Sequence, residues 1–172
     1  MRSRPTRSSS AAPAPPVADL GSMPPELRER LDEVLRDIGF GRLVGVEVLD
    51  WEPGRARTRL VPGAEQTNVH GFVHGGALFA VGDTAFEVAC NSYGRVCVGL
   101  DVSVHYAAPA QPGEALVAEA RELTRSRRVA SYGVEVRGED GLARCTALAV
   151  AFRTDRWHLG VDEWPPGWRD RH

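Results

Sequence analysis

A nearly all-apolar segment with one acid in its middle most constrains how this chain can fold. Residues 75–91 read Gly-Gly-Ala-Leu-Phe-Ala-Val-Gly-Asp-Thr-Ala-Phe-Glu-Val-Ala-Cys-Asn, the pattern of a helix that is apolar on almost every side. Such a helix is usually buried. A carboxylate within it is costly unless it is paired, hydrogen-bonded or protonated. Asp83 is therefore a candidate functional residue.

The same helix opens on Gly75 and Gly76. The first backbone N–H groups of a helix have no partner within it, and they can bind an anionic or polarised oxygen. Glycine suits this position because no Cβ blocks the approach of a substrate. An acid and an oxyanion-type donor on one buried element indicate a site.

Composition narrows the class of protein. The 172 residues suffice for one domain with a core, and 42% of them are apolar. A net charge of -2 gives no case for a nucleic-acid or membrane partner, and no apolar run approaches the ~20 residues of a membrane span. The three cysteines fit neither a disulfide framework nor a zinc site. We therefore expect a cytoplasmic protein with reduced cysteines and no metal.

The order of elements predicts an α+β fold. Residues 1–22 are rich in Arg, Ser, Ala and Pro and are expected to form a disordered extension rather than a targeting segment. An apolar stripe predicts a helix from Pro25 to Ile38. Strands are expected at 44–49, 55–61, 96–106, 114–124, 128–137 and 143–153, with the central helix at 75–91. Short turns favour antiparallel pairing of the strands.

The domain is expected to span residues 23–154, followed by a Trp- and Pro-rich tail at 155–172. The tail is too aromatic to be plainly disordered, so it packs either on its own domain or on a partner subunit. In the strand at 96–106, Val98, Val102 and Tyr106 are expected on one face. Asp101, Ser103 and His105 alternate with them, and a polar strand face explains these three better than a catalytic triad does.

These residues resemble the hotdog-fold acyl-CoA thioesterases, in particular the PaaI-type branch of the phenylacetate pathway. The resemblance covers about 41–152. It rests on Asn68-x(5)-His74-Gly75-Gly76-Ala77-x(5)-Asp83-Thr84-Ala85-Phe86, followed by Ala89-Cys90-Asn91-Ser92. The strand Val102-Ser103-Val104-His105-Tyr106, with Pro109 after it, also looks like the family's strand beyond the helix. The family fold is a long central helix wrapped by a curved antiparallel sheet, to which this chain adds an N-terminal helix.

The resemblance implies hydrolysis of an acyl-CoA to a free acid and CoA without metal or cofactor, because CoA is part of the substrate. It maps the catalytic carboxylate onto Asp83 and the backbone donor onto Gly75. It gives orienting roles to Asn68 and His74. The residues themselves leave two alternatives open, that Asn68 holds its own turn and that His74 caps the helix. The family branch favours aryl- or arylacetyl-CoA, with medium-chain acyl-CoA as the alternative. Asp83 acts either as a nucleophile or as the base that activates water.

Spacing within the helix predicts a dimer. Gly75 and Asp83 lie eight residues apart, roughly 12 Å along a helix axis. One thioester cannot closely touch both backbone positions in one chain, although a water and the Asp83 side chain shorten the gap. Two antiparallel central helices bring Asp83 of one subunit near Gly75 of the other. The family's interfacial sites agree, so we expect a homodimer, assembled further into a tetramer as a dimer of dimers.

Further residues are candidates for substrate contact. Gly76 is a second possible donor, and Thr84 either positions water or bonds back to the helix. Phe79 shares the face of Asp83 and either packs in the core or dimer interface or lines an acyl pocket. Glu87 lies on the same face, where the family usually has a small residue. Glu87 is a solvated acid, a salt-bridge partner or a second carboxylate coupled to Asp83. Arg128 belongs to a basic turn that is either solvated or contacts a CoA phosphate.

Two other functions remain open. A hotdog hydratase or dehydratase acts on the same thioesters, usually with a helix histidine that this helix lacks. A non-catalytic acyl-CoA-binding protein is the other possibility, against which Asp83, Gly75 and Gly76 argue.

Overall fold

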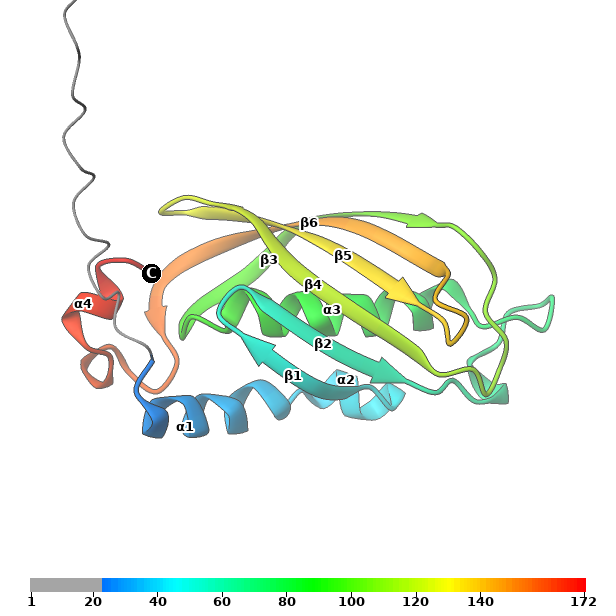
Figure 1. Ribbon diagram of the computed structural model, residues 1–172, viewed down its shortest axis with the longest axis horizontal. Helices are drawn as coiled ribbons and strands as arrows, with labels where there is room; N and C mark the ends of the chain where they lie inside the picture. The colour runs from blue at the N-terminus through cyan, green and yellow to red at the C-terminus, as the bar shows by residue number, and fades with distance from the viewer. Residues whose placement is uncertain (1–22) are drawn as a thin grey trace, which may run out of the picture.

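A long helix held in the hollow of a curved sheet dominates the structure (Figure 1). The structure is a computed structural model and describes residues 23–172, so the extension expected at 1–22 lies outside the described residues. The central helix α3 spans Gly75–Asn91, the predicted bounds. The six strands are antiparallel in the order β1-β2-β4-β5-β6-β3. The prediction of an α+β hotdog fold with an additional N-terminal helix is confirmed.

The strand bounds lie close to the predicted ones. The strands are β1 (Glu47–Glu52), β2 (Arg55–Leu60), β3 (Arg95–Tyr106), β4 (Leu116–Arg125), β5 (Val129–Arg137) and β6 (Ala143–Trp157). The first expected strand begins three residues later than predicted. Val44 instead ends the short helix α2 (Gly39–Val44), because Gly45 takes a φ of 83°, the left-handed conformation that ends helices.

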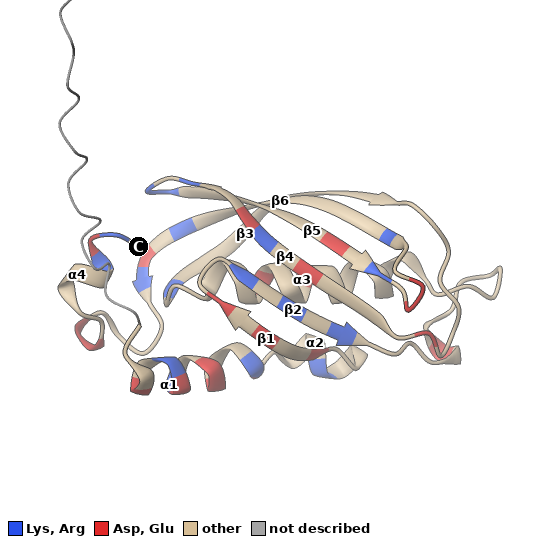
Figure 2. Cartoon of the chain, viewed as in Figure 1, with Lys and Arg blue, Asp and Glu red and all other residues tan. Residues whose placement is uncertain are grey.

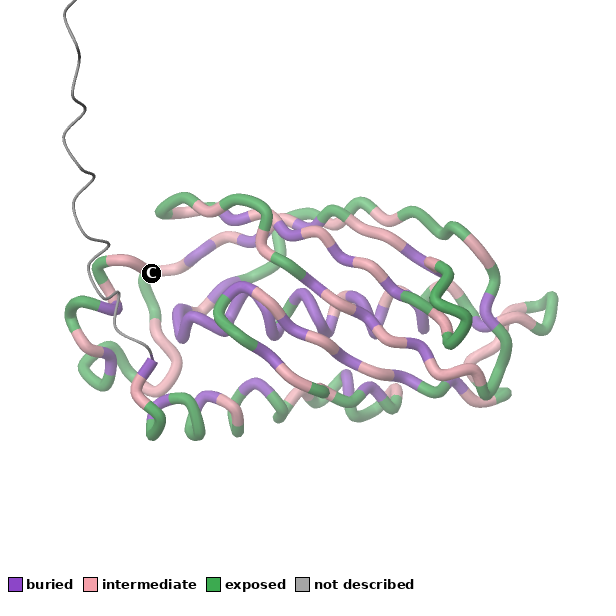
Figure 3. The backbone as a smooth tube through the Cα atoms, viewed as in Figure 1, coloured by how far each residue is buried: buried purple, intermediate pink, exposed green. Residues whose placement is uncertain are grey.

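Apolar packing holds α3 against the sheet. Leu78, Val81, Ala85 and Val88 are buried, and each fully buried aliphatic side chain of the size of Val or Leu contributes roughly 1.5–3 kcal/mol. Gly82 permits close approach, since a Cβ there would lie 3.2 Å from Cγ1 of Val134. Figure 3 shows the helix as almost wholly buried. Within residues 23–172 no helix is both long and apolar enough to cross a membrane.

The N-terminal helix α1 (Pro25–Arg36) lies along the side of the molecule that the sheet leaves open (Figure 1). Its stripe of Leu27, Leu31 and Leu35 is buried in the common core. The helix ends two residues before the predicted Ile38, and α2 follows almost directly. The two helices together cover the core beside α3.

A bulge overturns the predicted alternation in β3. The pairing with β6 shifts between Gly99 and Asp101, which adds one residue to β3. A Cβ at Gly99 would face Phe86 of α3, while Val102 and Val104 line a cavity beside α3. Val98 is exposed, so it does not share the inward face of Val102. The extra residue reverses the inward and outward positions along the strand.

The C-terminal tail packs on its own domain, the first of the two expected arrangements. Strand β6 continues to Trp157, and the tail then forms the turn η2 (Val161–Glu163) and the short helix α4 (Pro166–Arg169). Trp164 and Trp168 are 1% and 5% exposed and belong to the core. The indole Nε1 of Trp168 donates to the carbonyl of Tyr93 at 2.9 Å. The tail therefore covers the C-terminal end of α3.

This packing can be tested at two glycines that share a left-handed backbone. Gly94 has a φ of 83° and Gly71 a φ of 80°. A Cβ at Gly94 would overlap the indole ring of Trp164, whereas one at Gly71 meets nothing within 4 Å. Both Ala variants should lose roughly 1–2 kcal/mol from the backbone change. We expect Gly94→Ala to lose about 1–3 kcal/mol more, measured by urea unfolding. Equal losses would show that Trp164 is not packed there.

Candidate active site

One edge of α3 remains open to solvent. Gly75, Phe79, Asp83 and Glu87 follow each other at intervals of four and are partly or fully exposed. The only other residue of α3 that is not buried is Gly76. Residues four apart share one helix face. The candidate donor and both candidate carboxylates therefore lie on a single stripe, which we call the open stripe.

Asp83 borders a narrow apolar cavity between α3 and strands β3, β5 and β6. Phe79 and Phe86 line it from the helix, and Val102, Val104 and Val136 are among the residues from the sheet. Phe86 is buried edge-on against Tyr132, with ring centroids 5.4 Å apart. Burial among these apolar groups raises the pKa of the Asp83 carboxyl. Raised basicity is what a carboxylate needs to accept a proton from water.

Glu87 lies one turn beyond Asp83, near helix α1. It borders a shallow pocket with Val34, Leu35 and Ile38. Burial and then the negative charge of Asp83 raise the pKa of Glu87, although the residue as a whole is exposed in one chain. Within residues 23–172 it has no salt-bridge partner. Of the three interpretations left open for Glu87, the described residues support a solvated acid and a carboxylate coupled to Asp83 over a salt-bridge partner.

His74 caps α3 and decides which glycine can act as a donor. Its Nδ1 accepts a hydrogen bond from the Gly76 N–H at 2.9 Å, so the ring proton lies on Nε2 when the histidine is neutral. The structure therefore favours Gly75 over Gly76 as the donor, because the N–H of Gly76 is bonded to His74. The N–H of Gly75 makes no hydrogen bond within the described part of the chain. Gly75 is the free donor at the helix start.

A pocket of about 370 Å³ opens at this donor, and Asn68, Leu78 and Tyr106 are among its lining residues. Oδ1 of Asn68 accepts hydrogen bonds from the N–H groups of His70 and Phe72 at 2.9 and 3.3 Å. These bonds hold the turn and leave the side-chain NH₂ as the group that can donate into the pocket.

Tyr106 is a site residue that sequence reasoning missed. A Cβ at Gly75 would lie 3.1 Å from Cζ of Tyr106, so the ring forms the wall beside the free donor. The sequence carries no signal for this contact, because Tyr106 is simply the last residue of an alternating strand.

Two predicted substrate contacts lie elsewhere. The hydroxyl of Thr84 donates to the carbonyl of Ala80 at 2.8 Å, the helix-bonded alternative, and its methyl group faces α2. Arg128 lies in the β4–β5 turn, at the end of the molecule opposite the start of α3 (Figure 1), and pairs with Asp155 at 2.8 Å. Thr84 follows Asp83 directly in the sequence but faces away from the open stripe, and a single chain does not bring Arg128 to Asp83.

One chain also leaves the donor and the acid apart. Gly75 and Asp83 lie on the same face of α3, roughly 12 Å apart along its axis. They border different cavities, with only Leu78 common to both linings. The described residues include no group of three His, Cys, Asp or Glu side chains that could hold a metal ion.

Comparisons with known proteins decide the family. The family model of the Thioesterase superfamily matches residues 70–145, the segment that contains α3. The acyl-coenzyme A thioesterase PaaI of Escherichia coli K12 is 30% identical over 95 residues, which cover 55% of this chain and 68% of that protein. The chain belongs to the thioesterase superfamily. The predicted membership of the PaaI-type hotdog thioesterases, and with it the class of thioester hydrolase, is confirmed.

Solved structures of similar proteins agree with this. The TT0310 protein from Thermus thermophilus is 36% identical, with a TM-score of 0.65, and the match covers 68% of this chain and 98% of that one. A hypothetical thioesterase protein with coenzyme A from Streptococcus pneumoniae TIGR4 has a TM-score of 0.61 at 22% identity, covering 64% of this chain and 86% of that one. The second likeness shows the fold alone.

The raised pKa of Asp83 predicts how its removal changes stability. The ionised carboxylate opposes folding above the raised pKa, and the effect vanishes below the ordinary Asp pKa, where both states are protonated. We expect Asp83→Asn to raise Tm by a few degrees at about pH 8, and the gain to shrink as the pH falls. The control is Glu33→Gln, an exposed acid of α1. A lower Tm for Asp83→Asn at high pH would contradict this prediction.

Proposed function

We propose that this protein is an acyl-CoA thioesterase that hydrolyses acyl-CoA to a free acid and CoA. The observation that carries the proposal is the pairing, on one open stripe of α3, of a carboxylate at an apolar cavity with an unpaired backbone donor. Thioester hydrolysis needs both a group that supplies the nucleophile and a donor for the developing oxyanion.

In the first of two routes, Asp83 takes a proton from a water molecule whose oxygen attacks the thioester carbon. The N–H of Gly75 holds the oxyanion, assisted by the side-chain NH₂ of Asn68 and by the helix dipole. Collapse of the tetrahedral intermediate breaks the carbon–sulfur bond and releases the CoA thiolate, which takes up a proton. In the second route Asp83 attacks the carbonyl directly and displaces the CoA thiolate, which takes up a proton, and water then hydrolyses the mixed anhydride to the free acid and the Asp83 carboxylate.

The lining of the cavity beside Asp83 supports the proposal that the acyl group of the substrate is apolar. Valine, alanine and aromatic side chains dominate its lining, and Asp83 is its one ionisable carboxylate. Phe79 lies at the open stripe and borders the cavity, which suits contact with an aryl ring. We propose aryl- or arylacetyl-CoA as substrate, with medium-chain acyl-CoA as the alternative.

We propose that a homodimer completes each site. Strand β3 is an edge strand, paired only with β6 among the described residues, and an unpaired edge favours association with another chain. Leu100 on this edge is 59% exposed. The open stripe of α3 is left uncovered in a single chain. Antiparallel packing of two such stripes places Asp83 of one chain beside Gly75 of the other. The tetramer and the cytoplasmic location stay predictions.

A hydratase or a non-catalytic acyl-CoA binder remains the alternative. Helix α3 contains no histidine, the residue that the hydratases usually carry there. A thioesterase releases a free thiol from acyl-CoA, whereas a hydratase and a binder do not, so one thiol assay separates the classes.

Asp83 should be essential for thiol release. Against a panel of aryl-, arylacetyl- and medium-chain acyl-CoAs, we expect Asp83→Asn to lose at least about a hundredfold in kcat, since amide nitrogen neither accepts the proton nor attacks the carbonyl. Asn keeps the shape of the side chain, and circular dichroism checks the fold. Near-full activity in Asp83→Asn would reject the central assignment.

The dimer can be tested at the β3 edge. We expect Leu100→Arg to convert the protein to monomers and to lower kcat/KM at least about tenfold, because a charge would be buried without a partner at the interface. Leu142→Arg is the matched control, since Leu142 is 61% exposed but lies beside the β5–β6 turn. Light scattering and thiol release are measured on the same samples. An active monomer would contradict the interfacial site.

A further inference from the structure

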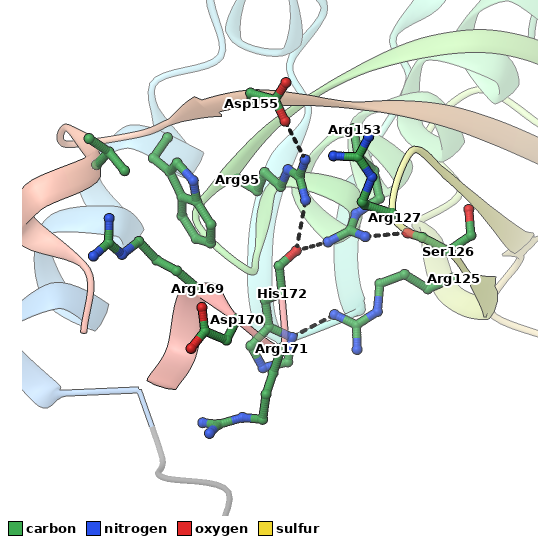
Figure 4. A pocket seen from close by; sticks show the side chains of 12 residues that line it. Arg95, Arg125, Ser126, Arg127, Arg153, Asp155, Arg169, Asp170, Arg171 and His172 are labelled. Carbon is green, nitrogen blue, oxygen red and sulfur yellow. Dashed lines mark hydrogen bonds and ion pairs between the residues drawn. The ribbon is translucent and has the colours of Figure 1, made fainter. Parts of the chain in front are cut away.

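An arginine-rich pocket of about 860 Å³ lies beside the C-terminal tail (Figure 4) and shares no lining residue with the cavity of Asp83. It is built from the start of β3, the β4–β5 turn, the end of β6 and the tail. Six arginines line it: Arg95, Arg125, Arg127, Arg153, Arg169 and Arg171. Only two acids, Asp155 and Asp170, stand with them among the described residues. Figure 2 shows the basic residues of this end beside the C-terminus.

Arg153 is the most buried arginine of the pocket, at 4% exposed. Its guanidinium donates to the carbonyl oxygen of Ser126 and to the main-chain oxygen of His172. No Asp or Glu side chain within residues 23–172 accepts a hydrogen bond from it. A buried charge is costly without a counter-charge. Burial, and then the positive charges of Arg95 and Arg125, lower the pKa of Arg153.

Two further arginines of the pocket have N–H groups that make no hydrogen bond within the described residues. Arg127 is exposed and makes no hydrogen bond or ion pair within the described residues. The Nε of Arg169 is buried and has no hydrogen-bond partner there. Arg95 does have a partner, Asp155 at 3.0 Å. Arginine presents a planar fork of donors that fits phosphate oxygens. The pocket therefore offers donors and positive charge to an anion.

An aromatic wall adds a second recognition element. Trp157, at the end of β6, lines the pocket beside the arginines. Trp164 packs behind it, with ring centroids 5.5 Å apart. An indole next to a basic cluster suits a ligand that joins a base to phosphates, because bases stack on aromatic rings.

We infer that this pocket binds the phosphate groups of an adenine nucleotide, which the acyl-CoA substrate supplies as its 3′-phosphorylated ADP end. The assignment to CoA rests on the function proposed above. The helix from Asp83 to Asn91 extends roughly 12 Å and leads through a short turn to Arg95 at the pocket. In the antiparallel dimer, this half of α3 projects past the start of the partner helix. The arm of CoA runs along it from the thioester to the arginines.

The first test measures binding of the nucleotide alone. Isothermal titration of the full-length dimer with 3′,5′-ADP should show binding, and the double variant Arg127→Gln/Arg169→Gln should weaken it at least about tenfold, as expected for lost charge-assisted hydrogen bonds. Neither arginine has a structural ion pair within residues 23–172, so the fold is expected to persist. Arg121→Gln, an exposed arginine of β4 outside the pocket, is the control. No binding by the wild type, or equal binding by the double variant, would overturn the inference.

The second test identifies the source of the phosphates. The ratio of kcat/KM for phenylacetyl-CoA to that for phenylacetyl-pantetheine, which lacks the nucleotide, should fall at least about tenfold in the double variant and stay unchanged in Arg121→Gln. An unchanged ratio beside weakened 3′,5′-ADP binding would overturn the assignment to CoA and indicate a free nucleotide. Inorganic phosphate binding as tightly as 3′,5′-ADP would contradict the base contact. If neither thioester is hydrolysed, the proposed function fails, and the titration with 3′,5′-ADP alone decides the pocket.

Discussion

Burial of α3 in the hollow of the sheet is the interaction on which the rest of this structure depends. The helix contributes Leu78, Val81, Ala85 and Val88 to the core, and Gly82 lets it approach β5 closely. A second tie is polar: the buried hydroxyl of Thr58 donates to the helix carbonyl of Val81 at 2.7 Å. Because the rest of the fold covers its other faces, the one face of α3 left open carries Gly75, Asp83 and Glu87. The packing that forms the core thus also places the site.

The groups that the proposed reaction needs also lower the stability of the fold. Asp83 lies where apolar neighbours raise its pKa, and Glu87, one turn away, adds a second negative charge. At the other end of the stripe, His74 satisfies the N–H of Gly76 and leaves that of Gly75 free. An ionised acid and an unpaired donor both weaken a fold. Their retention on one stripe is expected of a site that binds a developing oxyanion.

The residue pattern alone predicts the bounds of α3, because a long apolar run between His74 and Ser92 is compatible with few structures other than a buried helix. The antiparallel strands follow from alternation and turns. The inward face of β3 could not be predicted, because the bulge near Leu100 depends on pairing with β6. The sequence allows His74 either to cap α3 or to orient a carbonyl, and only the side-chain rotamer shows that it accepts the N–H of Gly76. The arginine pocket joins Arg95, Arg127 and Arg169, which are distant in sequence and meet only when the tail folds back.

Mixing two inactive variants tests the interfacial site most directly. Asp83→Asn removes the carboxylate. Gly75→Pro removes the N–H at a helix position whose backbone accepts proline, and its Cβ requires a small shift of the Tyr106 ring. His74 precedes it with a ψ of 140°, as a residue before proline requires. In a dimer that contains one chain of each variant, one site carries both substitutions and the other site carries neither. We predict that dissociated and reassembled mixtures regain up to about a quarter of wild-type thiol release, since half the dimers carry one intact site. Activity that stays at the level of the separate variants would contradict a site shared between two chains.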